Sequence, residues 1–205
     1  MTLTLYTHPM SRGRMARWML EELGQPYDAV YLDYATTMKT PDYLAINPMG
    51  KVPALVHDGR VVTECAAIVT YLADAFPDAG LMPADRAAFY RWMFFGAGPF
   101  ESAVTNKALG VEVPPEKRGF VGYGSFDRLL ATLDATLSAR DFLAGDRFSA
   151  VDLYVGSQIG YGLMFGSLPA SAALSAYWDR IKDRPARLRA AGLDDAELAR
   201  MKHDG

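Results

Sequence analysis

The residues with the clearest chemical potential surround Ser11, where a short strand is predicted to end in a turn and a helix to begin. Arg12, Arg14 and Arg17 follow directly. Cations in the first turns of a helix oppose its dipole, so helix stability does not account for them. Ser11 can cap the helix, or its hydroxyl can join the free backbone N–H groups of the helix amino terminus in facing a ligand anion. The local sequence leaves both interpretations open.

Two further stretches could also contribute to a binding site. Pro53 stands at a predicted strand start. A proline there can be cis and leave the backbone of Val52 free to pair with a ligand. Alternatively, it marks an ordinary edge strand. Glu64 and Cys65 stand at a predicted helix start, whose amides bind carboxylates. Alternatively, Glu64 complements the helix dipole and Cys65 is a small buried residue.

The elements that position these residues follow from apolar periodicity and turn signals. Alternating or apolar runs predict strands, and three- and four-residue spacings predict helices. The order is β-α-β followed by β-β-α, a thioredoxin-like α/β layout, with Asp58-Gly59 as the hairpin turn. A loop rich in Thr and Pro separates the two halves. The predicted strands are 3–6, 29–32, 52–56 and 61–63, and the helices are 12–23 and 64–75.

A change in pattern near residue 78 predicts a domain boundary. We expect an α/β domain over 1–77, a linker rich in Pro and Gly over 78–84, and an all-helical domain over 85–205. A leucine stripe between 126 and 137 predicts one amphipathic helix. Ser149 and Asp152 have the spacing of a variant capping box before a core helix.

Composition excludes several classes of function. The chain has 205 residues and a net charge of −3, which gives no general attraction for nucleic acid. No apolar run is long enough for a membrane span, and no secretory signal is visible, so a cytoplasmic protein is expected. Cys65 is the only cysteine, which excludes an intramolecular disulfide and a Cys-based zinc site. The three histidines, His8, His57 and His203, are scattered and do not support a metal site.

Four motifs, in this order and spacing, resemble the glutathione S-transferase family. They span both halves of the chain, and the string RWMLEELG looks most like the bacterial branch related to the serine-type classes. The motifs are YTHPMSRGRMARWMLEELG at 6–24, INPMGKVPALVHDG at 46–59, VVTECAAIVTYLADAFP at 61–77 and FLAGDRFSAVDLYVGS at 142–157. The resemblance implies a thioredoxin-like domain that holds glutathione as co-substrate, followed by an all-helical domain, and no metal.

The resemblance also implies roles for individual residues in glutathione binding. Val52 would pair through its backbone with the cysteinyl part, before a cis Pro53. Glu64 would hold the ammonium of the γ-glutamyl end and the Cys65 N–H its carboxylate. Lys51 lies where relatives often contact the glycyl carboxylate. Ser149 and Asp152 match a motif of the helical domain whose role is in folding.

The thiol-activating group remains open among three residues. The family uses Tyr, Ser or Cys as the hydrogen-bond donor, and no cysteine stands in the first helical turn here. Ser11 is the first candidate, Tyr6 is the second, and Arg12 could assist or replace the hydroxyl. An ungapped match to the Cys-type classes would place Arg12 at the catalytic position.

A pocket for an apolar electrophile is expected between the domains. The candidate walls of this pocket are Met10, Phe95, Pro99 and Tyr161, although the aromatic residues could simply belong to the core. The resemblance also implies a homodimer, because the family fold usually forms one. The leading function is glutathione transfer to a small apolar electrophile. The alternatives are glutathione-dependent peroxide or disulfide reduction, and a non-catalytic protein that binds glutathione, another ligand or a partner.

Overall fold

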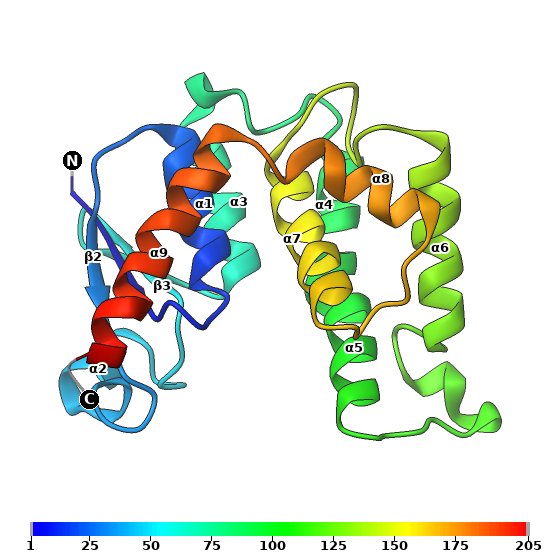
Figure 1. The fold of residues 1–205 in the computed structure, drawn as a ribbon, viewed down its shortest axis with the longest axis horizontal. Helices are drawn as coiled ribbons and strands as arrows, with labels where there is room; N and C mark the ends of the chain where they lie inside the picture. Colours follow the sequence, from blue (N-terminus) through cyan, green and yellow to red (C-terminus); the bar gives the residue numbers. More distant parts are fainter. Residues whose placement is uncertain (1, 204–205) are drawn as a thin grey trace. The chain divides into compact units, whose positions relative to one another are not determined.

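The computed structural model describes residues 2–203, which fall into two compact units. The first comprises residues 2–79 and 183–203, and the second comprises residues 80–182. The chain therefore returns to its first unit with its last helix (Figure 1). No helix among the described residues has the length and apolar character needed to cross a membrane.

The first unit is built on a four-stranded sheet with the order β2-β1-β3-β4. β1 pairs in parallel with β2 and antiparallel with β3, and β3 pairs antiparallel with β4. The strands are β1 (Leu3–Thr7), β2 (Asp28–Tyr31), β3 (Ala54–His57) and β4 (Arg60–Thr63). The helix α1 (Gly13–Leu23) connects the two parallel strands, which need a crossover of this kind. The predicted β-α-β and β-β-α order is confirmed.

Local chemistry explains the end of α1 and the start of α2. α1 ends at Gly24, whose φ of 65° lets its N–H reach the Leu20 carbonyl. α3 (Cys65–Ala75) begins directly after Glu64. α2 (Pro41–Ile46) lies where a loop was expected, so that prediction was wrong. Its first-position proline favours a helix start, but six residues are too few to show an apolar period.

The side chains of β1 alternate between the two faces of the sheet. Leu3, Leu5 and Thr7 are buried on one face, and a Cβ placed on Gly13 would lie 1.9 Å from the Thr7 hydroxyl oxygen. The side chain of Tyr6 therefore lies on the face opposite α1. There its ring packs against Tyr43, with the centroids 5.6 Å apart.

The last helix, α9 (Pro185–His203), packs against α1 within the first unit. The buried Arg17 on α1 donates from Nε to Asp194 Oδ1 at 2.9 Å and from its other nitrogens to the hydroxyls of Tyr27 and Tyr31. Arg184 binds Glu22 through two hydrogen bonds of 2.6 and 2.8 Å. The structure thus differs from the expected helical domain at its carboxyl end, because these ion pairs attach α9 to α1.

The second unit is entirely helical in its regular elements. A π-helical turn, Gly96–Phe100, links the first two helices and contains Pro99, which has no backbone N–H to donate. The helices are α4 (Arg86–Phe95), α5 (Glu101–Ala108), α6 (Phe126–Ala139), α7 (Ala150–Met164) and α8 (Ala172–Ile181). Leu129, Leu133 and Leu137 of the predicted leucine stripe are buried.

The capping box before α7 forms as predicted. Asp152 Oδ2 accepts hydrogen bonds from the Ser149 N–H at 2.9 Å and from its hydroxyl at 2.8 Å. Asp152 Oδ1 also accepts from the Leu143 N–H and the Tyr177 hydroxyl. Burial raises the pKa of Asp152, and these donors oppose the shift. The carboxyl group therefore joins α7 to the preceding loop and to α8.

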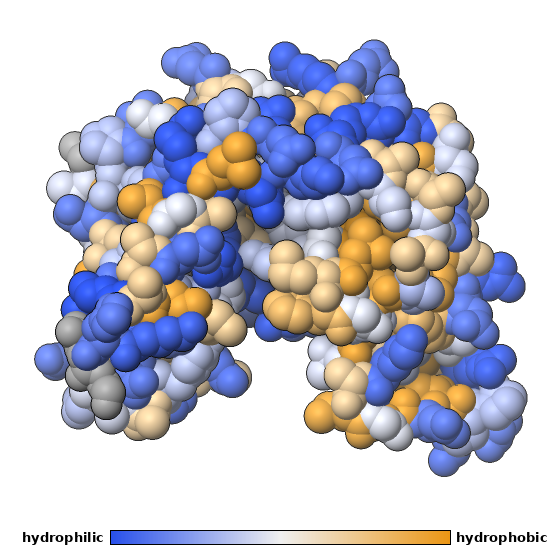
Figure 2. All heavy atoms as spheres, viewed as in Figure 1, coloured by the Kyte–Doolittle hydropathy of each residue, from blue (hydrophilic) through white to orange (hydrophobic). Residues whose placement is uncertain are grey.

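The second unit also exposes apolar side chains near the end of α5. Leu109, Val111 and Phe120 are 72%, 49% and 87% exposed. Figure 2 shows apolar atoms gathered on the visible face around α5 and the loop after it.

Candidate active site

The turn between β1 and α1 holds Ser11 in a defined position. The Ser11 hydroxyl donates to the His8 carbonyl at 2.7 Å and accepts from the Gly13 N–H at 2.9 Å. The Ser11 N–H also donates to the His8 carbonyl, at 3.0 Å. The His8 carbonyl would therefore keep the Ser11 N–H as a donor if the Ser11 hydroxyl turned its proton to another acceptor. Ser11 thus both caps the helix and retains a proton it can redirect, so the two interpretations of this residue are compatible.

His8 stabilises the same turn as an acceptor. Its Nδ1 accepts from the Met10 N–H at 3.0 Å, which requires that nitrogen to be unprotonated. Burial lowers the pKa of His8, although Asp33 acts in the opposite direction. The neutral ring is therefore favoured in the folded state.

The arginines after Ser11 separate into two groups. Arg14 pairs with Asp195 at 2.6 Å and Arg17 pairs with Asp194 at 2.9 Å, so both bind α9. These ion pairs with residues of the last helix account for two of the cations that helix stability left unexplained. Arg12 is exposed and lies beside the turn.

The amino termini of α1 and α3 meet at this turn. The thiol of the buried Cys65 donates to the Arg12 carbonyl at 3.5 Å. Glu64 stands directly before α3 and is exposed. Its backbone has φ 65° and ψ 120°, and a positive φ is strained for a residue with a Cβ. Strain of this kind is typical of binding sites. Two helix amino termini thus adjoin a serine, an arginine and a glutamate, and the dipoles of both helices favour negative charge there.

The loop before β3 completes the set of predicted glutathione contacts. The Val52–Pro53 peptide bond is cis, and Val52 lies two residues before the sheet ladder begins at Ala54. The Lys51 carbonyl accepts from the Tyr43 hydroxyl and from Asn47 Nδ2 at 2.8 Å, so α2 and the residue after it fix the loop. The Lys51 side chain is exposed.

Tyr6 is placed differently from Ser11 and Arg12. Its side chain lies on the opposite face of the sheet, against the buried cluster of Leu32, Met38, Tyr43 and Ala54. This placement separates it from the turn that carries Ser11 and favours Ser11 and Arg12 as candidates.

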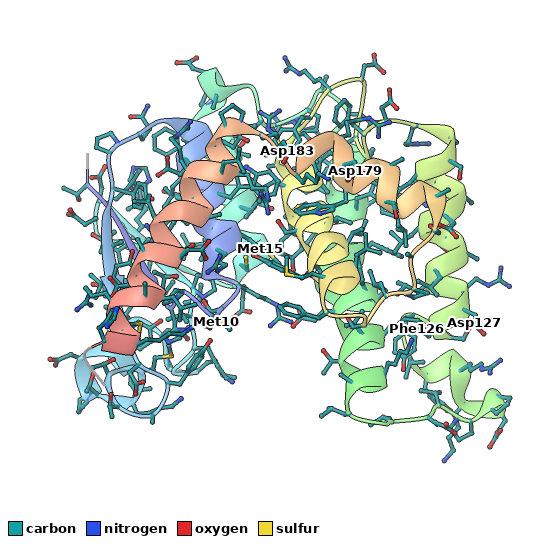
Figure 3. All side chains as sticks on the ribbon, viewed as in Figure 1. Met10, Met15, Phe126, Asp127, Asp179 and Asp183 are labelled. Atoms are coloured by element: carbon teal, nitrogen blue, oxygen red, sulfur yellow. The ribbon has the colours of Figure 1, made fainter. Side chains whose placement is uncertain are left out.

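The predicted electrophile-pocket residues lie in both units. Met10 belongs to the first unit, in the turn that leads into α1, and is 60% exposed (Figure 3). Phe95, Pro99 and Tyr161 belong to the second. Phe95 meets Trp92 edge to face, with centroids 5.0 Å apart, and Tyr161 stacks on Phe165 at 6.3 Å.

Sequence reasoning missed two contributors to this site. The Tyr34 hydroxyl donates to the Met10 carbonyl at 2.9 Å, and Lys39 Nζ donates to the Gly50 carbonyl at 2.8 Å. Both lie in the polar segment after β2, where no periodicity or motif distinguishes them. Among residues 2–203, no group of three or more His, Cys, Asp or Glu side chains could hold a metal ion.

Comparison with known proteins agrees with this geometry. The family model for the glutathione S-transferase N-terminal domain matches residues 1–74, and that for the C-terminal domain matches residues 124–185. Glutathione S-transferase GST-4.5 of Xanthomonas campestris is 33% identical, over 94% of this chain and 100% of its own.

Solved structures give the same result. A sphingomonad glutathione S-transferase complexed with glutathione has a TM-score of 0.76 at 33% identity and covers 94% of this chain and 98% of its own. A glutathione S-transferase from Xylella fastidiosa has a TM-score of 0.77 at 26% identity, with the same coverage. The chain belongs to the glutathione S-transferase family, and the resemblance seen in the sequence is confirmed.

Proposed function

We propose that this protein is a glutathione transferase that activates the thiol of glutathione for attack on a small apolar electrophile. The observation that carries the proposal is the meeting of two helix amino termini at Ser11, marked by the 3.5 Å contact between the Cys65 thiol and the Arg12 carbonyl. Family membership and the relatives named above support the same activity.

Glutathione binding is assigned to the groups around that meeting point. Glu64 binds the ammonium of the γ-glutamyl end, and the Cys65 N–H at the start of α3 binds its carboxylate. Val52 pairs through its backbone with the cysteinyl part, since it lies outside the sheet ladder. Lys51, exposed beside it, binds the glycyl carboxylate.

Thiol activation is assigned to Ser11 with the help of Arg12. A free thiol has a pKa near 8.5, and lowering it by about two units needs roughly 2.7 kcal/mol of preferential stabilisation of the thiolate. Ser11 redirects its proton from the His8 carbonyl to the sulfur, and the Gly13 N–H keeps polarising the hydroxyl. The Arg12 guanidinium and the α1 amino terminus add positive potential.

The chemical step is nucleophilic addition or substitution. The thiolate forms a carbon–sulfur bond, and in substitution the leaving group departs with the electron pair of the broken bond. Met10 in the first unit, and Phe95, Pro99 and Tyr161 in the second, are each assigned to electrophile binding, because each presents apolar surface. We further assign the protein to the cytoplasm. We also propose that it forms a homodimer, and gel filtration with light scattering can test this oligomeric state.

The test is turnover with wild-type protein and the Glu64→Gln variant. Wild type should bind glutathione in calorimetry and conjugate it to an activated aryl chloride, and Glu64→Gln should weaken binding. Turnover with an organic hydroperoxide but not with the aryl chloride would replace transfer by peroxide reduction. Binding without either reaction would leave a non-catalytic glutathione carrier, and no binding at millimolar glutathione would contradict the proposal.

A further inference from the structure

Tyr34 joins the segment after β2 to the turn that carries Ser11. Its side chain is 46% exposed, yet both its ring and its hydroxyl are engaged. The ring packs against His8, with the centroids 4.4 Å apart. The hydroxyl donates to the Met10 carbonyl at 2.9 Å. Tyr34 therefore contacts the turn on both sides of Pro9.

The Tyr34 hydroxyl also lies among the groups assigned to thiol activation. Burial raises the pKa of Tyr34, while the charge of Arg12 and the Ser11 side chain act in the opposite direction. The single proton of the Ser11 hydroxyl is donated to the His8 carbonyl, so Tyr34 reaches Ser11 through the Met10 carbonyl it holds. Tyr34 is thus placed to act on Ser11 rather than directly on the sulfur.

We infer that Tyr34 is a positioning residue for thiol activation, whose hydroxyl fixes the turn from which Ser11 and Arg12 project. The inference rests on the proposed function. By holding the Met10 carbonyl, Tyr34 restricts the backbone directly before Ser11. A donor held in place stabilises the developing charge without reorganising at the moment of reaction.

The test replaces Tyr34 by phenylalanine, which keeps the ring on His8 and removes only the hydroxyl. Tyr90→Phe is the matched control, because Tyr90 is 45% exposed and lies on α4 in the second unit. Three quantities are measured for each protein: the Kd for glutathione, the pKa of the bound thiol from thiolate absorbance, and the conjugation rate below that pKa.

Tyr34→Phe should raise the thiol pKa by about half a unit to one unit and slow conjugation about three- to tenfold, the effect of one lost hydrogen bond. The Kd for glutathione should change less than about twofold, since the assigned anchors lie on other segments. Tyr90→Phe should change none of these quantities. In a Ser11→Ala background, Tyr34→Phe should raise the thiol pKa by less than it does in wild type, because only the position of Arg12 is then left to disturb.

Two results with an active wild-type protein would overturn the inference alone. One is an unchanged thiol pKa and rate in Tyr34→Phe. The other is a weaker Kd or a lower melting temperature with an unchanged thiol pKa, which would make Tyr34 only structural. If wild type itself binds no glutathione, or leaves the thiol pKa at its free value, the proposed function fails and the role of Tyr34 fails with it.

Discussion

Replacing Asp194 by asparagine should change how the stability of the protein depends on pH. Asp194 is fully buried on α9, and its Oδ1 accepts from Arg17 at 2.9 Å. Its Oδ2 has no hydrogen-bond partner among the described residues. Burial raises the pKa of Asp194 from 3.8 to about 6, although Arg17 acts in the opposite direction. Ionisation of Asp194 is therefore harder in the folded state than in the unfolded state.

The sign and size of the effect follow from this pKa. A folded state with a raised pKa binds the proton more tightly, so the stabilisation is complete below pH 3.8 and is lost as the pH rises through about 6. At about 1.36 kcal/mol per unit, the shift corresponds to roughly 3 kcal/mol. Compared with Asp194→Asn, wild type should lose about that much free energy of unfolding between pH 4 and pH 7.

Urea unfolding of wild type, Asp194→Asn and Asp195→Asn across this pH range measures the effect. Asp195 is the matched control, since it pairs with Arg14 from the next position but its side chain is 65% exposed. Its variant should differ from wild type by under about 1 kcal/mol at every pH. A constant difference between wild type and Asp194→Asn would refute the raised pKa. A difference that grows in favour of wild type with rising pH would show that the ion pair outweighs burial.

Four further predictions concern packing and binding. In thermal melts, Gly13→Ala should destabilise the protein by about 1–3 kcal/mol, because its Cβ would lie 1.9 Å from the Thr7 hydroxyl oxygen. Gly192→Ala has open space around the new Cβ and should stabilise α9 by about 0.5–1 kcal/mol in the same melts. Asp152→Asn should lower the free energy of unfolding by at least about 3 kcal/mol, since an amide N–H₂ would face donors, and a variant as stable as wild type would refute the role of this network. Glu64→Gln should weaken glutathione binding about 10- to 100-fold in calorimetry, and an unchanged Kd would remove Glu64 from the site.

Features governed by local sequence could be predicted. The hairpin at Asp58-Gly59 joins His57 to Arg60 as expected, because this dipeptide supplies the required turn. The capping box joins Ser149 and Asp152, which are only three positions apart, and it formed as predicted. Ser11 follows a strand and precedes a helix, so its place at a helix amino terminus was also determined locally.

Features that depend on distant partners could not be predicted. The bond between Arg17 and Asp194 joins residues 177 positions apart, and nothing in either local sequence identifies the partner. This pair attaches α9 to the first unit and explains an arginine for which helix stability does not account. The contact of Tyr34 with Met10, 24 positions away, depends equally on the tertiary fold. Sequence periodicity describes which face of an element is apolar, but not which polar groups meet.

The most direct test of the central claim is the pKa of the glutathione thiol bound to wild type, Ser11→Ala and Arg12→Ala, measured by thiolate absorbance with binding confirmed by calorimetry. We expect a pKa about two units below the free value of about 8.5 in wild type, a return towards 8.5 in Ser11→Ala with the Kd retained, and a smaller rise in Arg12→Ala. A thiol pKa that is lowered equally in wild type and Ser11→Ala would contradict the role of Ser11, and a wild-type protein that leaves the thiol pKa at its free value would contradict thiol activation altogether.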